Sequence, residues 1–134
     1  MRNRILLSVH PRHAEAILAG TKLFEFRRVV PARPPRWVSL YATAPVLRIV
    51  GEFEVARVLS DEPAELWADT AEFAGITRAE FDRYFHGKQL AHAFEVFEPL
   101  RFEHAIDPRA LAKNSGCVFN PPQSFCYWPA EGWS

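Results

Sequence analysis

The stretch Leu18–Arg28, LAGTKLFEFRR, changes its hydrophobic period within a few residues. Up to Gly20, a residue typical of helix ends, alanine and aliphatic side chains recur at helical spacing. From Lys22 onward the hydrophobic period is two, so that Phe24 and Phe26 face one way while Glu25 and Arg27 face the other, as in a strand with one buried face. The stretch therefore predicts a helix, a turn and a strand. Lys22 has the wrong parity to share the face of Glu25 within a regular strand, so we expect it in the turn.

Similar patterns extend outward over the rest of the chain. Four further segments have strand character: 4–8, 36–42, 46–58 and 90–102. Gly51 in the third of these marks a bulge or bend, and Pro99 in the fourth needs an edge or bulge position because proline cannot donate to a sheet.

Helical signals lie between the last two strands. One predicted helix starts near Pro63 in a segment closed by Gly75, and a second follows Thr77, which has capping-box spacing to Glu80. The tail, 117–129, is too rich in proline for a helix but is aromatic. Short strands around small helices, with strands at both ends of the chain, predict an α+β fold in the form of a compact barrel closed by its termini.

Length and composition narrow the classes of protein. The 134 residues fit a single domain, 1–134. No run of about 18 apolar residues is present, and the N-terminus lacks the features of a signal peptide, so we expect a cytoplasmic protein without membrane contact. Cys117 and Cys126 lack CxxC or zinc-knuckle spacing and are expected to be free thiols. His10 and His13 have no third ligand nearby, and we predict neither metal nor cofactor.

The net charge of zero conceals an uneven distribution. Residues 1–48 hold nine lysines and arginines against two acids, or +7, and the remainder holds seven against fourteen, or −7. If the basic part gathers on one face, it offers a site for phosphates. The alternative is that the two halves fold together and neutralise each other.

Four segments in the same order resemble the ASCH domain family. The first is HPRHAEAILAGTKLFEFRR, in which a helix ends at glycine and a lysine and a Glu-x-Arg pair follow. The others are SLYATAPVLRIVGEFEV, FAGITRAEFDRYFHGK and the closing PPQSFCYW. The resemblance thus covers nearly the whole chain.

This resemblance implies a small PUA-like β-barrel of about five to six strands with short flanking helices. It implies a cleft lined by Lys22 and the Glu25-x-Arg27 strand, and binding of RNA or a modified nucleoside or nucleotide. The residues predicted to contact nucleic acid are Lys22, Glu25, Arg27, Arg28, Tyr41, Arg48, Gln123 and Ser124. We also expect Lys22, Glu25 and Arg27 to share one cavity with the PPQSF segment, 121–125.

Two enzyme activities are associated with the family, and the sequence does not decide between binding and catalysis. Amide hydrolysis of N4-acetylcytidine would assign catalytic roles to Lys22, Glu25 and Glu80, although Glu25 stands where that branch has a threonine. RNA cleavage would point to Tyr41, Ser124 and Arg48. Besides a nucleic-acid-binding protein and an enzyme, a third class of function is a protein-interaction module that uses the acidic second half of the chain.

Overall fold

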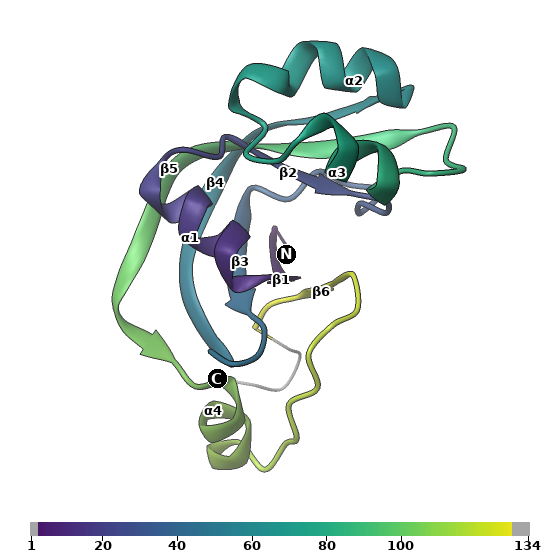
Figure 1. The fold of residues 1–134 in the computed structure, drawn as a ribbon. Coiled ribbons are helices and arrows are strands. Elements are labelled where there is room, and N and C mark those ends of the chain that lie inside the picture. Colours follow the sequence, from purple (N-terminus) through teal and green to yellow (C-terminus); the bar gives the residue numbers. More distant parts are fainter. Residues whose placement is uncertain (1–2, 130–134) are drawn as a thin grey trace.

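The computed structural model describes residues 3–129, which form one six-stranded sheet with four α-helices and a short 3-10 helix around it (Figure 1). The elements are β1 (Arg4–Val9), α1 (Pro11–Ala19), β2 (Phe24–Arg27), β3 (Trp37–Ala42), β4 (Arg48–Asp61), α2 (Pro63–Thr70), η1 (Ala71–Phe73), α3 (Arg78–Tyr84), β5 (Ala91–Ile106), α4 (Pro108–Asn114) and β6 (Phe125–Tyr127). None of the helices between residues 3 and 129 has the length and apolar character that crossing a lipid bilayer requires.

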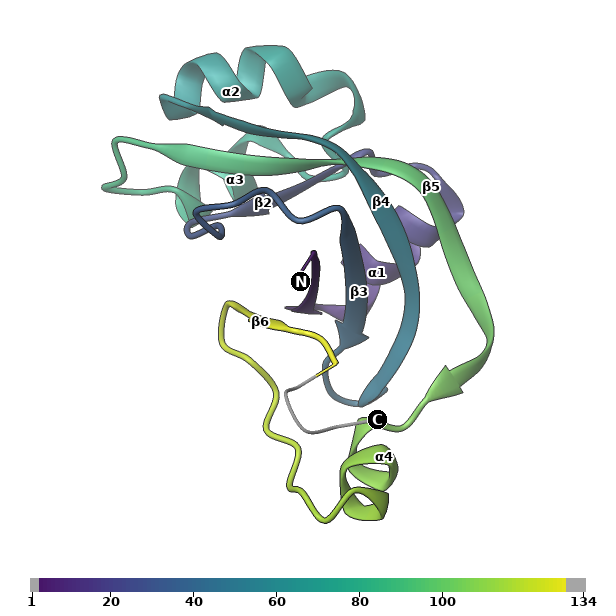
Figure 2. The same cartoon turned by 180° about the vertical axis from the view of Figure 1, so that it is seen from behind.

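The sheet has the strand order β2-β5-β4-β3-β1-β6, and only the β1–β3 pair is parallel. The long strands β4 and β5 bend together into a curved wall (Figure 2). Gly51 lies at an irregularity of their pairing, and a Cβ on it would lie 2.5 Å from the carbonyl oxygen of Leu100. The predicted bulge at Gly51 is therefore confirmed, and glycine is required there because the two backbones approach closely. Pro99 lies beyond the part of β5 that pairs with β2, so it disrupts no hydrogen bond on that side.

The curl brings the two edge strands of the sheet, β2 and β6, toward each other. Arg27 at the end of β2 spans the remaining gap, since its guanidinium donates to the carbonyl oxygens of Ser8 in β1, at 3.2 Å, and Ser124 just before β6, at 2.8 Å. The predicted small barrel of about five to six strands with flanking helices is confirmed, as a six-stranded sheet curled into a half-barrel. At this seam a side chain, rather than a ladder of backbone hydrogen bonds, connects the strands.

Three apolar clusters fix the helices against the sheet. Ala14 and Ile17 of α1 pack into a cluster on one face of β1, β3 and β4. Leu66 of α2 and Phe81 of α3 pack with the phenylalanines of β2. Ala112 of α4 packs with Tyr41 and Phe119 in the third cluster. Helix α4 was not predicted from the sequence, although Asp107 accepts hydrogen bonds from two backbone N–H groups at the start of this helix, as helix-capping aspartates do.

The charged halves of the chain neutralise each other in part. Four arginines of the first 48 residues pair with acids of the second half: Arg4 with Glu52, Arg12 with Glu80, Arg36 with Glu54 and Arg48 with Asp107. The remaining basic residues include Lys22, Arg27 and Arg28, which belong to the cavity described next.

Candidate functional site

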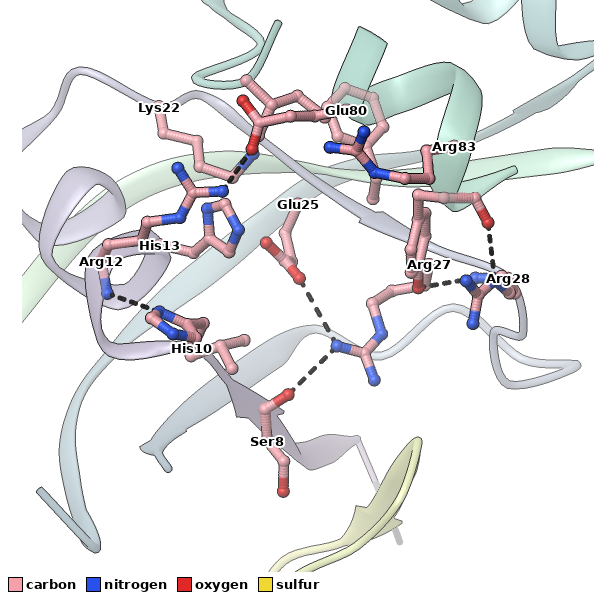
Figure 3. Close-up of a pocket in the computed structure, with 14 residues that line it drawn as sticks. Ser8, His10, Arg12, His13, Lys22, Glu25, Arg27, Arg28, Glu80 and Arg83 are labelled. Atoms are coloured by element: carbon pink, nitrogen blue, oxygen red, sulfur yellow. Dashed lines mark hydrogen bonds and ion pairs between the residues drawn. The ribbon is translucent and has the colours of Figure 1, made fainter. Parts of the chain in front are cut away.

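A cavity of about 420 Å³ lies where the end of β1, the start of α1, the segment before β2, β2 itself and α3 meet (Figure 3). Five cationic side chains line it, those of Arg12, Lys22, Arg27, Arg28 and Arg83. Two carboxylates, Glu25 and Glu80, accompany them. The cavity therefore has an excess of positive charge within a protein whose net charge is zero.

Lys22 lies in the turn before β2, as predicted, but it is not an exposed turn residue. Its side chain is 1% exposed, and its Nζ donates to the carbonyl oxygen of Ala74 at 2.6 Å. Nζ also lies 4.9 Å from the centre of the Phe26 ring, a cation–π distance. Burial lowers the pKa of Lys22, and the negative charges of Glu25 and Glu80 oppose that shift. A lysine of lowered pKa is a stronger candidate nucleophile or base than an ordinary one.

Gly75 packs closely against the aliphatic part of the Lys22 side chain. Its φ is +71°, and a Cβ on it would lie 2.5 Å from Lys22 Cγ. Only a residue without a side chain therefore fits between the turn after η1 and the lysine stem.

Glu25 and Arg27 form the floor of the cavity together with Lys22. Their exposures are 6% and 9%, and Arg27 Nη1 lies 3.5 Å from Glu25 Oε2. The alternation predicted for this strand accounts for their common direction, because the phenylalanines on the opposite parity pack against α2 and α3. The same arginine connects β2 to β1 and β6, so floor and barrel seam share one side chain.

Glu80 lies on α3 at the edge of the cavity, and its environment argues against a role as proton acceptor. The capping box with Thr77 is present as predicted. Hydrogen bonds from Arg12 and Thr77 lower the pKa of Glu80 to about 2. A general base works best with a pKa near the working pH. The catalytic role of Glu80 stays a prediction, with a pKa far below that range.

His13, on α1, also lines the cavity. Burial, followed by the positive charges of Lys22 and Arg12, lowers the pKa of His13 to about 4. The imidazole is therefore neutral at physiological pH and contributes hydrogen-bonding capacity rather than charge.

Three exposed arginines surround the mouth of the cavity: Arg12, Arg28 and Arg83. Arg28 is held by Tyr84, because its Nε donates to the Tyr84 carbonyl at 2.7 Å and its guanidinium lies 4.1 Å from the centre of the tyrosine ring. We call these three residues the rim, and Lys22, Glu25 and Arg27 the floor.

The remaining predicted contact residues lie outside the cavity lining. Tyr41 is 1% exposed and packs against Phe119 in the third apolar cluster, so base stacking on its ring would require the ring to be uncovered. The Arg48 guanidinium donates a hydrogen bond to the carbonyl oxygen of Leu47 and forms an ion pair with Asp107. Gln123 is exposed. Ser124 reaches the site only through its carbonyl oxygen, which accepts from Arg27. The PPQSF segment thus contacts the floor but is not part of the cavity wall, and the roles of these residues stay predictions.

Arg12, Arg83 and Tyr84 line the cavity but were not among the site residues predicted from the sequence. Helical spacing contains a signal for two of them, since residues three and four positions after Glu80 lie on its face of α3. From the sequence, His10 and His13 were considered only as metal ligands and judged insufficient for a metal site, whereas in the structure His10 caps α1 and both histidines line the cavity.

The family assignment rests on a match to the ASCH domain over residues 7–105. The chain belongs to the ASCH family. An ASCH domain-containing ribonuclease of Zymomonas mobilis subsp. mobilis is 29% identical to this ASCH protein, over 97% of this chain and 87% of that protein.

Solved structures agree with the assignment. The crystal structure of the Zymomonas mobilis ASCH protein has a TM-score of 0.86 and 26% identity, covering 98% of this chain and 92% of that one. A variant of it with one serine replaced by alanine has a TM-score of 0.87 and 27% identity, over 98% and 92% of the two chains. The N-terminal domain of Staphylothermus marinus McrB, with a TM-score of 0.53 and 12% identity over 91% of this chain and 89% of that one, shares only the fold. The fold is of the PUA-like type, as the sequence resemblance implied.

Proposed function

We propose that this ASCH domain binds single-stranded RNA, with one base entering the cavity and the neighbouring phosphates lying on the rim. The observation that carries the proposal is the division of the cavity into an exposed cationic rim and a buried polar floor. Arginines at a surface suit phosphates, which supply affinity, whereas buried polar groups suit base edges, which supply specificity. A volume of about 420 Å³ lies within the range of small-molecule sites.

The comparison with relatives supports RNA as the class of ligand. The Zymomonas mobilis relative that covers nearly all of this chain is named a ribonuclease. Single-stranded rather than duplex RNA fits the geometry, because a base has to leave a stack in order to enter a cavity. A free modified nucleotide remains the alternative ligand for the same cavity.

Salt dependence separates a phosphate-bearing RNA from a neutral nucleoside, which has no phosphate to place on the rim. Each phosphate contact on a single strand contributes about −0.7 to the slope of log affinity against log salt. Three rim arginines then imply roughly a 20-fold loss of affinity between about 50 and 200 mM salt. The measurement is fluorescence polarisation of a labelled single-stranded RNA.

Arg28→Ala tests the rim directly. It is expected to reduce the salt slope by about 0.7, which corresponds to one phosphate contact. Arg109→Ala, an exposed arginine on α4 outside the cavity lining, is the control and should leave the slope unchanged. Affinity that does not respond to salt would contradict phosphate binding and favour a neutral small ligand.

RNA cleavage is the second candidate function, and unpartnered hydroxyl groups favour it. Among the described residues, Ser8 Oγ and Tyr41 Oη are buried side-chain atoms without a hydrogen-bond partner. Ser8 on β1 lies opposite Tyr41 on β3. On the other side of β1 the pairing with β6 ends at Leu7 and Phe125, and Ser124 is the residue just before Phe125. Solved variants of the Zymomonas mobilis protein include one with a serine replaced by alanine and one with a tyrosine replaced by phenylalanine, replacements that remove hydroxyl groups.

Tyr41→Phe tests the RNA-cleavage function, and a loss of activity would not be due to unfolding because little loss of stability is expected. Because Oη has no partner within residues 3–129, its removal is expected to change the free energy of unfolding by less than about 1 kcal/mol. If the hydroxyl takes part in catalysis, cleavage of labelled single-stranded RNA should fall about 100-fold or more. Tyr127→Phe, on β6, is the matched control. Undiminished cleavage by Tyr41→Phe would exclude Tyr41 from the chemistry.

Amide hydrolysis of an acylated nucleoside has one feature in its favour, the lowered pKa of Lys22. Two features oppose it. Glu80 has a pKa of about 2, and Glu25 presents a carboxylate where the amidohydrolase branch has a hydroxyl. Release of acetate from N4-acetylcytidine by the purified protein is the assay that decides this point.

A further inference from the structure

Glu25 is a buried carboxylate with almost no hydrogen bonds. It is 6% exposed, and among the described residues its closest charged partner is Arg27, at 3.5 Å. Charge-assisted hydrogen bonds are normally about 2.7–2.9 Å long. A carboxylate has about four acceptor positions, and buried polar groups are normally satisfied. Figure 3 shows this carboxylate directed into the cavity, so N–H groups of a ligand are its natural partners.

Donors lie beside this acceptor. Lys22 Nζ uses one N–H on the carbonyl oxygen of Ala74, and an ammonium group has three. Lys22 and Glu25 line the same cavity (Figure 3). The floor thus offers a pair of acceptor oxygens next to a cationic donor.

Among the four standard RNA bases, guanine has the matching edge. Its N1–H and N2 amino group form two adjacent donors, with the O6 acceptor on the other side of N1. Adenine and cytosine each place one amino group beside a ring nitrogen lone pair, which would face the carboxylate. Uracil has a single N–H between two carbonyl groups. A carboxylate beside a cation is therefore complementary to guanine and partly repulsive toward the other three bases.

We propose that the cavity selects guanine in single-stranded RNA, with Glu25 accepting from N1–H and the N2 amino group while Lys22 donates to O6. This inference rests on the proposed function, because it assigns a base to the nucleotide that enters the cavity. The rim arginines contact phosphates and do not distinguish sequences. The selectivity belongs to the floor.

The test uses four uridine decamers, labelled at the 5′ end: one unmodified and three with a single central guanosine, adenosine or inosine. Guanosine is expected to increase affinity at least about tenfold over adenosine and uridine, as bidentate base contacts do. Inosine keeps N1–H and O6 but lacks the N2 amino group, and it is expected to bind roughly tenfold more weakly than guanosine because one hydrogen bond to a charged group is lost. This comparison needs no variant of the protein.

The second part of the binding experiment uses the Glu25→Gln variant. Glutamine replaces one acceptor by an N–H₂ donor, so the preference for guanosine over adenosine should disappear while binding of the uridine decamer persists through the rim. Glu95→Gln on β5, whose carboxylate pairs with Arg57 at the surface, is the matched control and should keep the preference.

The outcomes separate the two proposals. Equal binding of all four decamers, equal binding of guanosine and inosine, or an unchanged guanosine preference in a folded Glu25→Gln protein would overturn guanine selection and leave RNA binding intact. Absence of binding to every decamer at low salt would overturn the proposed function, and guanine selection with it.

Discussion

Methionine in place of Arg27 is expected to lower the free energy of unfolding by about 3–5 kcal/mol, the usual range for removing one partner of a buried ion pair. Arg27 is 9% exposed and makes three contacts that methionine cannot replace: the Glu25 carboxylate and the carbonyl oxygens of Ser8 and Ser124. The substitution leaves the buried Glu25 carboxylate without its ion-pair partner. It also leaves the edge strands β2 and β6 without the side chain that connects them.

Urea unfolding of the purified variants measures this effect. Arg57→Met is the matched control, because Arg57 pairs with Glu95 at the surface and exposed pairs contribute about 0–1 kcal/mol. Arg27→Lys retains the charge but lacks the planar fork that reaches two carbonyl groups, so its stability should lie between those of the wild type and Arg27→Met. A loss below about 1 kcal/mol for Arg27→Met would show that the seam does not depend on this side chain.

Alanine in place of Gly75 is expected to cost about 2–5 kcal/mol of stability, from a left-handed backbone strain of about 1–2 kcal/mol and an overpacking cost of about 1–3 kcal/mol. The φ of Gly75 is +71°, and the new Cβ would lie 2.5, 2.7 and 2.9 Å from three carbons of the Lys22 stem. Folded protein that remains should bind RNA more weakly, because Lys22 is displaced from the floor.

Gly87→Ala isolates the two contributions. Gly87 has a similar φ of +77°, but beyond its chain neighbours no atom lies within 4 Å of the Cβ that alanine would add. It should therefore show only the backbone strain, about 1–2 kcal/mol, and leave RNA binding unchanged. Equal losses of stability in both alanine variants would contradict the tight contact between Gly75 and Lys22.

The pattern of residues was sufficient to predict the local elements. The change of period around Gly20 predicted α1, the turn and β2, and the alternation within β2 predicted that Glu25 and Arg27 share a face opposite the phenylalanines. The spacing of Thr77 and Glu80 predicted the capping box. These features depend on residues a few positions apart, whose relative directions are set by helix and strand geometry alone.

Other features required distant segments to meet. The exposure of Lys22 could not be predicted from its turn, because Ala74 and Gly75, more than fifty residues away, enclose it. Because the Lys22 stem packs closely against Gly75, an arginine at position 22 would alter packing as well as charge. Tyr41 has the alternating pattern of a strand residue whether it is exposed or buried, and distant residues, including Ala112 of α4 and Phe119, contribute to its burial.

The sequence by itself therefore determined the family, the order of the elements and the face on which Glu25 and Arg27 lie. The tertiary structure decided which charges remain available to a ligand. Arg4, Arg36 and Arg48 pair with acids outside the cavity, whereas the curl of the sheet brings the floor residues under the rim arginines, of which Arg12 pairs with Glu80 in the cavity lining. The physical reason is that a charge keeps or loses its partner according to distances in space, and sequence spacing specifies those distances only within a single helix or strand.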